Sequence, residues 1–108
     1  MLPVPTAREL EVLEARNKRR QAARRAFDSL ARKAQDDSRL RLAIGTLPRL
    51  WHGLAVEERL GQHLAEAEAG LHNLPATLPD YERARAALRC EGLRHFNQSF
   101  RVALDGVR

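Results

Sequence analysis

The chain has 108 residues, a length that suits one domain rather than two independent hydrophobic cores. Hydrophobic residues make up 44% of the chain and charged residues 31%, and no apolar run approaches the roughly 18 residues that a membrane span requires. The single cysteine, Cys90, excludes an internal disulfide, and residues 1–10 lack the basic and apolar regions of a secretory signal. We therefore expect a cytoplasmic protein with one domain and no membrane contact.

The first predicted helix covers residues 6–36. Thr6 and Glu9 are spaced as in a capping box, which is typical of a helix start, and no glycine or proline follows before residue 45. The apolar stripe of this helix consists of alanines over residues 22–26, where leucines would bury more area. We therefore expect most of the circumference at the middle of the helix to face solvent or a partner.

Three further helices are predicted, over residues 38–45, 47–73 and 79–104. Gly45 ends the helix predicted over residues 38–45, and Pro75 follows the end of the helix predicted over residues 47–73. Leucines and alanines recur at steps of three and four in the third predicted helix of the chain, which is a strong helical pattern. The chain as a whole is predicted to be all-α.

The four predicted helices favour a three- to four-helix bundle. The long N-terminal and C-terminal helices would pair antiparallel, with the middle segment packed across them. The apolar residues form a modest core for helices of this length, and the first helix carries few leucines. Self-association would stabilise such a helix, so a homodimer or a higher homo-oligomer is expected.

Positive charge is concentrated in the N-terminal half of the chain. Lys and Arg number 19 against 14 Asp and Glu, which gives a formal net charge of +5. Residues 1–54 carry a net charge of +6 and residues 55–108 carry −1. Residues 16–33 alone contain eight cations and one acid, as an electrostatic binding surface would. The eight cations are Arg16, Lys18, Arg19, Arg20, Arg24, Arg25, Arg32 and Lys33.

Helical spacing aligns several of these cations. Residues 16, 20 and 24 share one face of a helix, and residues 18 and 25 share another. Cations at these steps can contact successive phosphates, which predicts sequence-tolerant, salt-sensitive binding of nucleic acid. On this interpretation the protein is a regulator or a structural subunit of a nucleoprotein complex.

Two other interpretations of the cationic segment remain open. It could be a solvated charged face with no ligand, or it could meet an acidic protein surface. In the second case the protein would be an adaptor, an anti-activator, a chaperone or a phage-encoded inhibitor.

No motif for reading base sequence is present. Arg20 and Gln21 stand where a basic leucine-zipper region requires two alanines after Asn17, and no leucine heptads follow. A helix-turn-helix is not indicated either, because no small residue lies four positions before Gly45 or Gly61.

The residue types of catalysis are not grouped in the sequence. None of the four histidines lies three or four positions from another, and there is no glycine-rich phosphate loop. Cys90 suits a buried small residue better than a nucleophile. We therefore expect no enzyme, no metal site and no cofactor.

Trp51 is the main candidate for an anchor on a protein partner. It lies with Leu47 and Leu54 at a break between predicted helices, and tryptophan is enriched at interfaces. Phe96 and Phe100 on the last helix are further candidates. The alternative for all five side chains is a place in the core.

Overall fold

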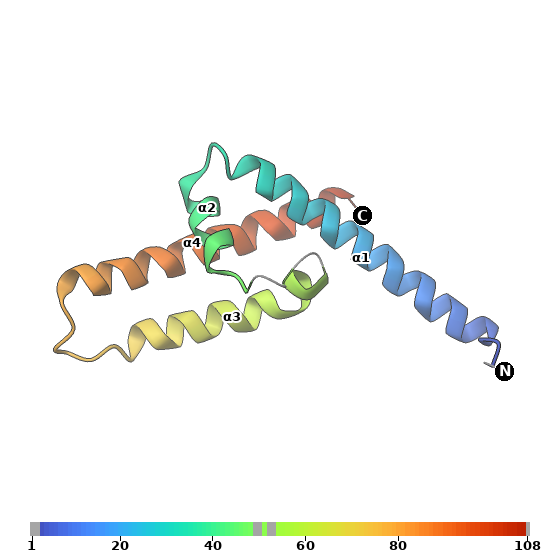
Figure 1. The fold of residues 1–108 in the computed structure, drawn as a ribbon, viewed down its shortest axis with the longest axis horizontal. Coiled ribbons are helices and arrows are strands. Elements are labelled where there is room, and N and C mark those ends of the chain that lie inside the picture. Colours follow the sequence, from blue (N-terminus) through green and yellow to red (C-terminus); the bar gives the residue numbers. More distant parts are fainter. Residues whose placement is uncertain (1–2, 49–50, 52–53, 108) are drawn as a thin grey trace.

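A computed structural model of the chain describes residues 3–48, 51 and 54–107 (Figure 1). Within these residues there are four helices and no strand, which confirms the prediction of an all-α helical bundle. The helices are α1 (Ala7–Lys33), α2 (Ser38–Thr46), α3 (Leu54–His72) and α4 (Asp80–Val107).

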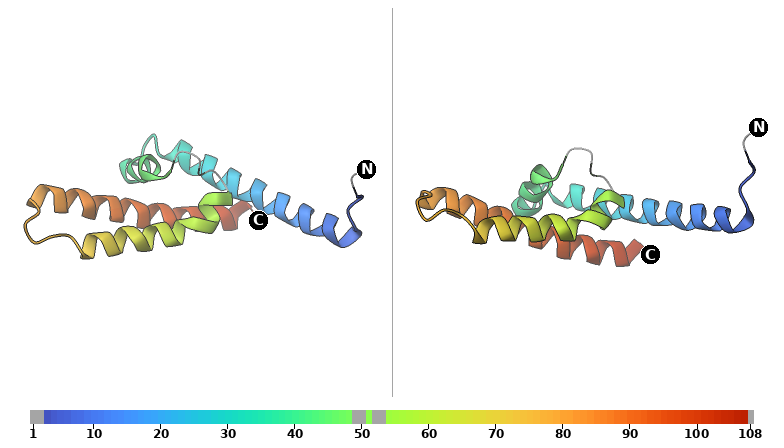
Figure 2. Two further views of the ribbon diagram at one scale, coloured as in Figure 1. Left: turned by 60° about the horizontal axis from the view of Figure 1, so that its bottom comes forward. Right: turned by 90° about the horizontal axis from the view of Figure 1, so that it is seen from below.

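Helix α4 is the central element of the bundle. It contacts α1, α2 and α3, and each of these three helices packs against a different stretch or side of it (Figure 2). The molecule measures 62 × 30 × 21 Å along its principal axes. Its length is partly due to α1, whose N-terminal half extends beyond the other helices (Figures 1 and 2).

Aromatic side chains of α4 form the middle of the core. The rings of Phe96 and Phe100 stack with their centroids 6.0 Å apart, and Phe27 of α1 meets Phe96 edge-on at 6.2 Å. These are favourable geometries for aromatic pairs. The other buried members of the core come from all four helices and from residues that cap them: Ala23, Ala26, Leu30, Ala34, Leu40, Ala43, Leu47, Val56, Leu60, Leu93 and Leu104.

Helix α1 begins as the sequence predicts and then divides into two parts. The Thr6 hydroxyl accepts a hydrogen bond from the Glu9 amide at 3.2 Å, and the Glu9 carboxylate accepts one from the Thr6 amide at 3.3 Å. Every residue from 3 to 21 is exposed, and packing against the bundle begins at Ala22. We call residues 7–21 of α1 the arm.

The alanine-rich middle of α1 is buried on one side. Ala23 and Ala26 are fully buried, while Arg24 and Arg25 between them are exposed. Small side chains let a helix lie close to its neighbours, so alanine serves the packing here even though it buries little area. The part of α1 that is exposed around its whole circumference is the arm, which precedes the middle.

Helix α2 is capped by Asp37 and lies close to α4. The Asp37 carboxylate accepts hydrogen bonds from the amides of Arg39 and Leu40, at 3.0 and 3.3 Å. A Cβ atom on Gly92 of α4 would lie 3.1 Å from the Arg39 carbonyl oxygen. Glycine at position 92 thus permits the close approach of the two helices.

The helix boundaries differ from the predicted ones by three residues or more at three places. The first helix ends at Lys33 instead of residue 36. The third helix begins at Leu54 instead of residue 47, because Leu47 is the extended C-cap residue of α2 and Pro48 follows it. The last helix continues through Val107 instead of ending at residue 104. Leu104 is buried in the core, so the final turns of α4 are held in place by packing.

Candidate nucleic-acid interface

The eight cations predicted to contact phosphates all lie on α1 with exposed side chains. They do not form a single face. The buried residues of α1 show which side of the helix faces the bundle, and helical spacing then places each cation relative to that side.

One group of cations lies on the side of α1 away from its buried alanines. Lys18, Arg25 and Arg32 recur every seven residues, which aligns them along the helix at steps of about 10.5 Å. Arg24 lies next to Arg25 on the exposed flank of the helix, about 100° around the axis from the buried Ala23. We call these four residues the outer cations.

A second group lies on the side of α1 that faces the bundle. Arg16 and Arg19 precede Ala23 and Ala26 at alternating steps of three and four residues, so they continue the buried face into the arm. The Arg19 guanidinium lies 3.8 Å from the Glu58 carboxylate of α3. We call Arg16 and Arg19 the inner cations; Arg20 and Lys33 lie at the edges between the two groups.

Within the described residues, no carboxylate forms an ion pair with an outer cation. Among the residues that the structure describes, Arg19 is the one member of the eight that forms an ion pair. That pair is long and exposed on both sides, so it contributes little to stability. Asp28 lies one turn from both Arg24 and Arg32, and it reduces the net positive charge of this side without forming an ion pair there.

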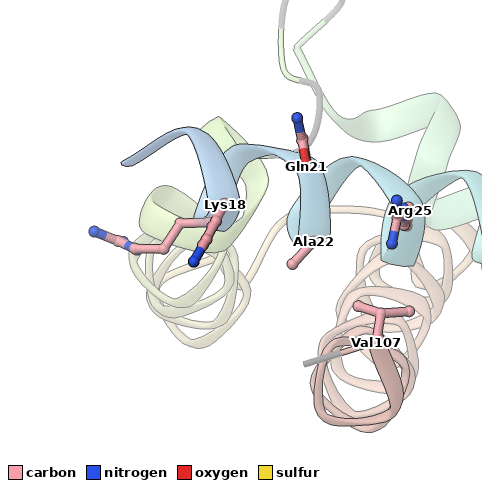
Figure 3. Close-up of a pocket in the computed structure, with 6 residues that line it drawn as sticks. Lys18, Gln21, Ala22, Arg25 and Val107 are labelled. Carbon is pink, nitrogen blue, oxygen red and sulfur yellow. The ribbon is translucent and has the colours of Figure 1, made fainter. Parts of the chain in front are cut away.

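A shallow groove lies beside two of the outer cations (Figure 3). It has a volume of about 430 Å³ and runs between α1 and the C-terminal end of α4. Lys18, Arg25 and the inner cation Arg19 line it together with the apolar side chains of Ala22 and Val107. Figure 3 shows Val107 facing Arg25 across it. Val107 carries no functional signal in the sequence, because only the fold brings the end of α4 to α1.

Three of the five predicted partner anchors are core residues instead. Phe96 exposes 0% of its surface, Phe100 2% and Leu47 8%. The prediction that they contact a partner is wrong, because the stacking of α1 and α4 encloses both rings and α2 ends with Leu47 turned inward. The side chain of Leu54 lies outside the part of the chain that the structure describes.

Trp51 is half-buried and packs against the core. Its ring meets the ring of His63 edge-on, with centroids 5.2 Å apart, and the Arg59 guanidinium lies 6.0 Å from its centroid. Contacts with two residues of α3 give Trp51 a structural role in joining the segment after α2 to α3. Its remaining exposed surface is available to a partner.

The described residues contain no group of three or more His, Cys, Asp or Glu side chains placed to hold a metal ion. The free cysteine, Cys90, is buried. In the same part of the chain, none of the helices is both long and apolar enough to cross a membrane. Comparison with known protein families, curated proteins and solved structures finds no match to this chain.

Proposed function

We propose that the protein binds nucleic acid through the outer cations of α1, which contact the sugar-phosphate backbone. The observation that supports this is the alignment of Lys18, Arg25 and Arg32, with Arg24, along about 21 Å of one helix side. None of these four side chains forms an ion pair with another described residue. Exposed cations without carboxylate partners are ready to replace the counterions of a phosphate chain.

The chemistry of the outer cations suits backbone contact rather than base recognition. Arginine presents several N–H donors in a planar fork and forms bidentate hydrogen bonds with phosphate, and lysine acts as a compact positive charge. Such contacts hold a protein on nucleic acid without reading its sequence. A role as a regulator or as a structural subunit of a nucleoprotein complex is consistent with this mode of binding.

Fluorescence anisotropy with labelled duplex DNA and single-stranded DNA tests the proposal. The chain offers a matched pair of variants: Arg24→Gln with Arg25→Gln removes two outer cations, and Arg16→Gln with Arg19→Gln removes the two inner cations. Each double variant lowers the net charge by the same amount on the same helix. Loss of two phosphate contacts should make the negative slope of log K against log salt concentration less steep by about 1.8. We expect this change for the variant that lacks the two outer cations.

The inner pair should change the slope by clearly less, because its cations face the bundle. The proposal fails if the wild-type protein binds neither form of DNA at low salt. It also fails if the two double variants lose affinity equally, since net charge alone would then explain the binding.

An interaction with an acidic protein is the second candidate. The observation in its favour is a set of exposed apolar side chains in the segment that precedes the cations, namely Val4, Leu10, Val12 and Leu13. Apolar contacts beside charges are typical of protein interfaces rather than of phosphate binding. The absorbance ratio at 260 and 280 nm of the purified protein, before and after a high-salt wash, distinguishes the two: only bound nucleic acid raises this ratio.

A further inference from the structure

Two unpartnered features of this chain are complementary to each other. The first is the tip of the arm, residues 7–15. Leu10 exposes 46% of its surface and Leu13 52%, and Glu14 follows on the same helix face at the steps of three and four. The tip contains three acids and one cation, a net charge of −2 in a basic chain. An acidic helix with two exposed leucines thus projects from the bundle.

The second feature is an open groove on the bundle between α2, α3 and α4, with a volume of about 820 Å³. Leu42, Ala67 and Leu93 supply apolar surface in it. Two arginines and one histidine also line it, namely Arg41, Arg89 and His63, and no carboxylate is among its described lining residues. A basic groove with apolar walls is therefore opposite in charge to the tip of the arm and similar to it in apolar content.

The arm cannot enter the groove of its own chain. Ala7–Lys33 is one uninterrupted helix, and about 30 Å of it separate Leu13 from Lys33, where α2 approaches. Figure 1 shows the arm pointing away from α2, and both views of Figure 2 agree. The segment that fits the groove must come from a second copy.

We propose that the tip of the arm docks in the α2–α3–α4 groove of a second copy of this chain. Leu10 and Leu13 contact the apolar walls, and Glu14 pairs with Arg89 of the other copy. Arg41 is less suited to pair with Glu14, because its guanidinium already donates hydrogen bonds to the carbonyl oxygens of Ala34 and Gln35. If each copy receives the arm of the other, the contact is two-fold symmetric and occurs twice.

Docking also explains how the arm keeps its helical form. An isolated helix of about 15 residues is marginal in water, and every residue of the arm is exposed. The outer cations lie on the following part of α1 and are not part of this contact. The proposal therefore does not depend on the binding of nucleic acid, and its experiment contains none.

Light scattering and sedimentation over a series of protein concentrations test the proposal. The expected mass is twice the 12.2 kDa of one chain. The double variant Leu10→Asp with Leu13→Asp should be a monomer, because it places charge on the docking leucines. Val102→Asp is the matched control, since Val102 is 73% exposed on α4 and lies outside the arm and the groove. Circular dichroism confirms that each variant keeps its helices.

A charge exchange makes the test specific for the two partners. Glu14→Arg and Arg89→Glu should each weaken the dimer at least about tenfold in Kd, because each places like charges against one another. A mixture of the two variants should dimerise again, since both contacts in the mixed dimer then join opposite charges. A monomeric wild-type protein at every concentration overturns the proposal, and so does a dimer that the leucine variant leaves intact or that the mixture does not restore.

Discussion

The carboxylate of Asp37 joins α2 to α4 through His95. Its Oδ2 atom lies 2.7 Å from Nε2 of His95, while Oδ1 accepts the amide hydrogen bonds that cap α2. One side chain thus starts a helix and attaches it to the centre of the bundle. The two residues are far apart in the chain, so this link depends on the tertiary fold.

This link predicts a loss of stability in acid. The hydrogen bond with His95, followed by the amides of Leu40 and Arg39, holds the pKa of Asp37 below its ordinary value of 3.8, against the opposing effect of burial. Because the folded state lowers this pKa, the stabilisation is complete above the ordinary value and is lost as the pH falls through the lowered one. The midpoint temperature of thermal unfolding, measured by circular dichroism, should therefore decrease as the pH is lowered through that range.

The variant Asp37→Asn should lower the midpoint at neutral pH and should flatten its dependence on acid pH. Asp36→Asn is the control, because the Asp36 carboxylate forms no hydrogen bond or ion pair with another described residue. An acid profile that Asp37→Asn leaves unchanged would show that other carboxylates account for the loss.

Phe96 is predicted to be a main determinant of stability. Its ring is fully buried and contacts the rings of Phe27 and Phe100. Phe96→Ala would leave a cavity at this point and should lower the free energy of unfolding by about 3–5 kcal/mol. Urea unfolding followed by circular dichroism measures the change. Tyr81→Ala on the same helix, where Tyr81 is 64% exposed, should change it by less than about 0.5 kcal/mol.

Two glycines should respond to substitution in opposite directions. Gly92→Val places a branched side chain against the Arg39 carbonyl oxygen, only 3.1 Å from the new Cβ atom, and should destabilise the fold by about 1–3 kcal/mol. Gly61→Ala in α3 meets open space and should stabilise it by about 0.5–1 kcal/mol, because alanine is the better helix former. Thermal unfolding of both variants checks this. Equal effects would contradict the close α2–α4 approach.

The arm and the core should differ in amide hydrogen exchange. Every residue of the arm is exposed, whereas α4 near Phe96 is enclosed by the other helices. Amides of the arm should therefore exchange many-fold faster than those of α4 in dilute protein, where local fraying opens an unsupported helix. Mass spectrometry of the exchanged peptides measures the difference. Slow exchange of the arm in a sample shown to be monomeric would contradict this prediction.

Local sequence patterns were sufficient for the helices and some of their ends. The capping box of Thr6 and Glu9 forms as predicted, because it requires only residues of one turn. The predicted start of the third helix, residue 47, was wrong. Pro48 is compatible with the first turn of a helix, but it is equally compatible with the extended backbone that begins at Leu47. Exposure of the cations on α1 was also readable, because charged side chains are seldom buried.

The assignment of core and surface could not be derived from the sequence in the same way. Phe96 and Phe100 have the spacing of an apolar face, and that spacing is the same whether the face meets other helices or a partner. Likewise, Lys18 and Arg19 are adjacent in the sequence and both line the groove beside Val107. Only the position of α3 brings Arg19, and not Lys18, within 3.8 Å of Glu58.

The sequence alone therefore determined that the chain is helical, where its positive charge lies and which residues could face inward, because these follow from interactions within a few turns. The tertiary structure decided which apolar side chains are enclosed, which cations remain unpaired and that the arm stands apart from the bundle. These depend on contacts between residues far apart in the chain, since the packing of α1, α2 and α3 on α4 selects one arrangement among many with the same local pattern.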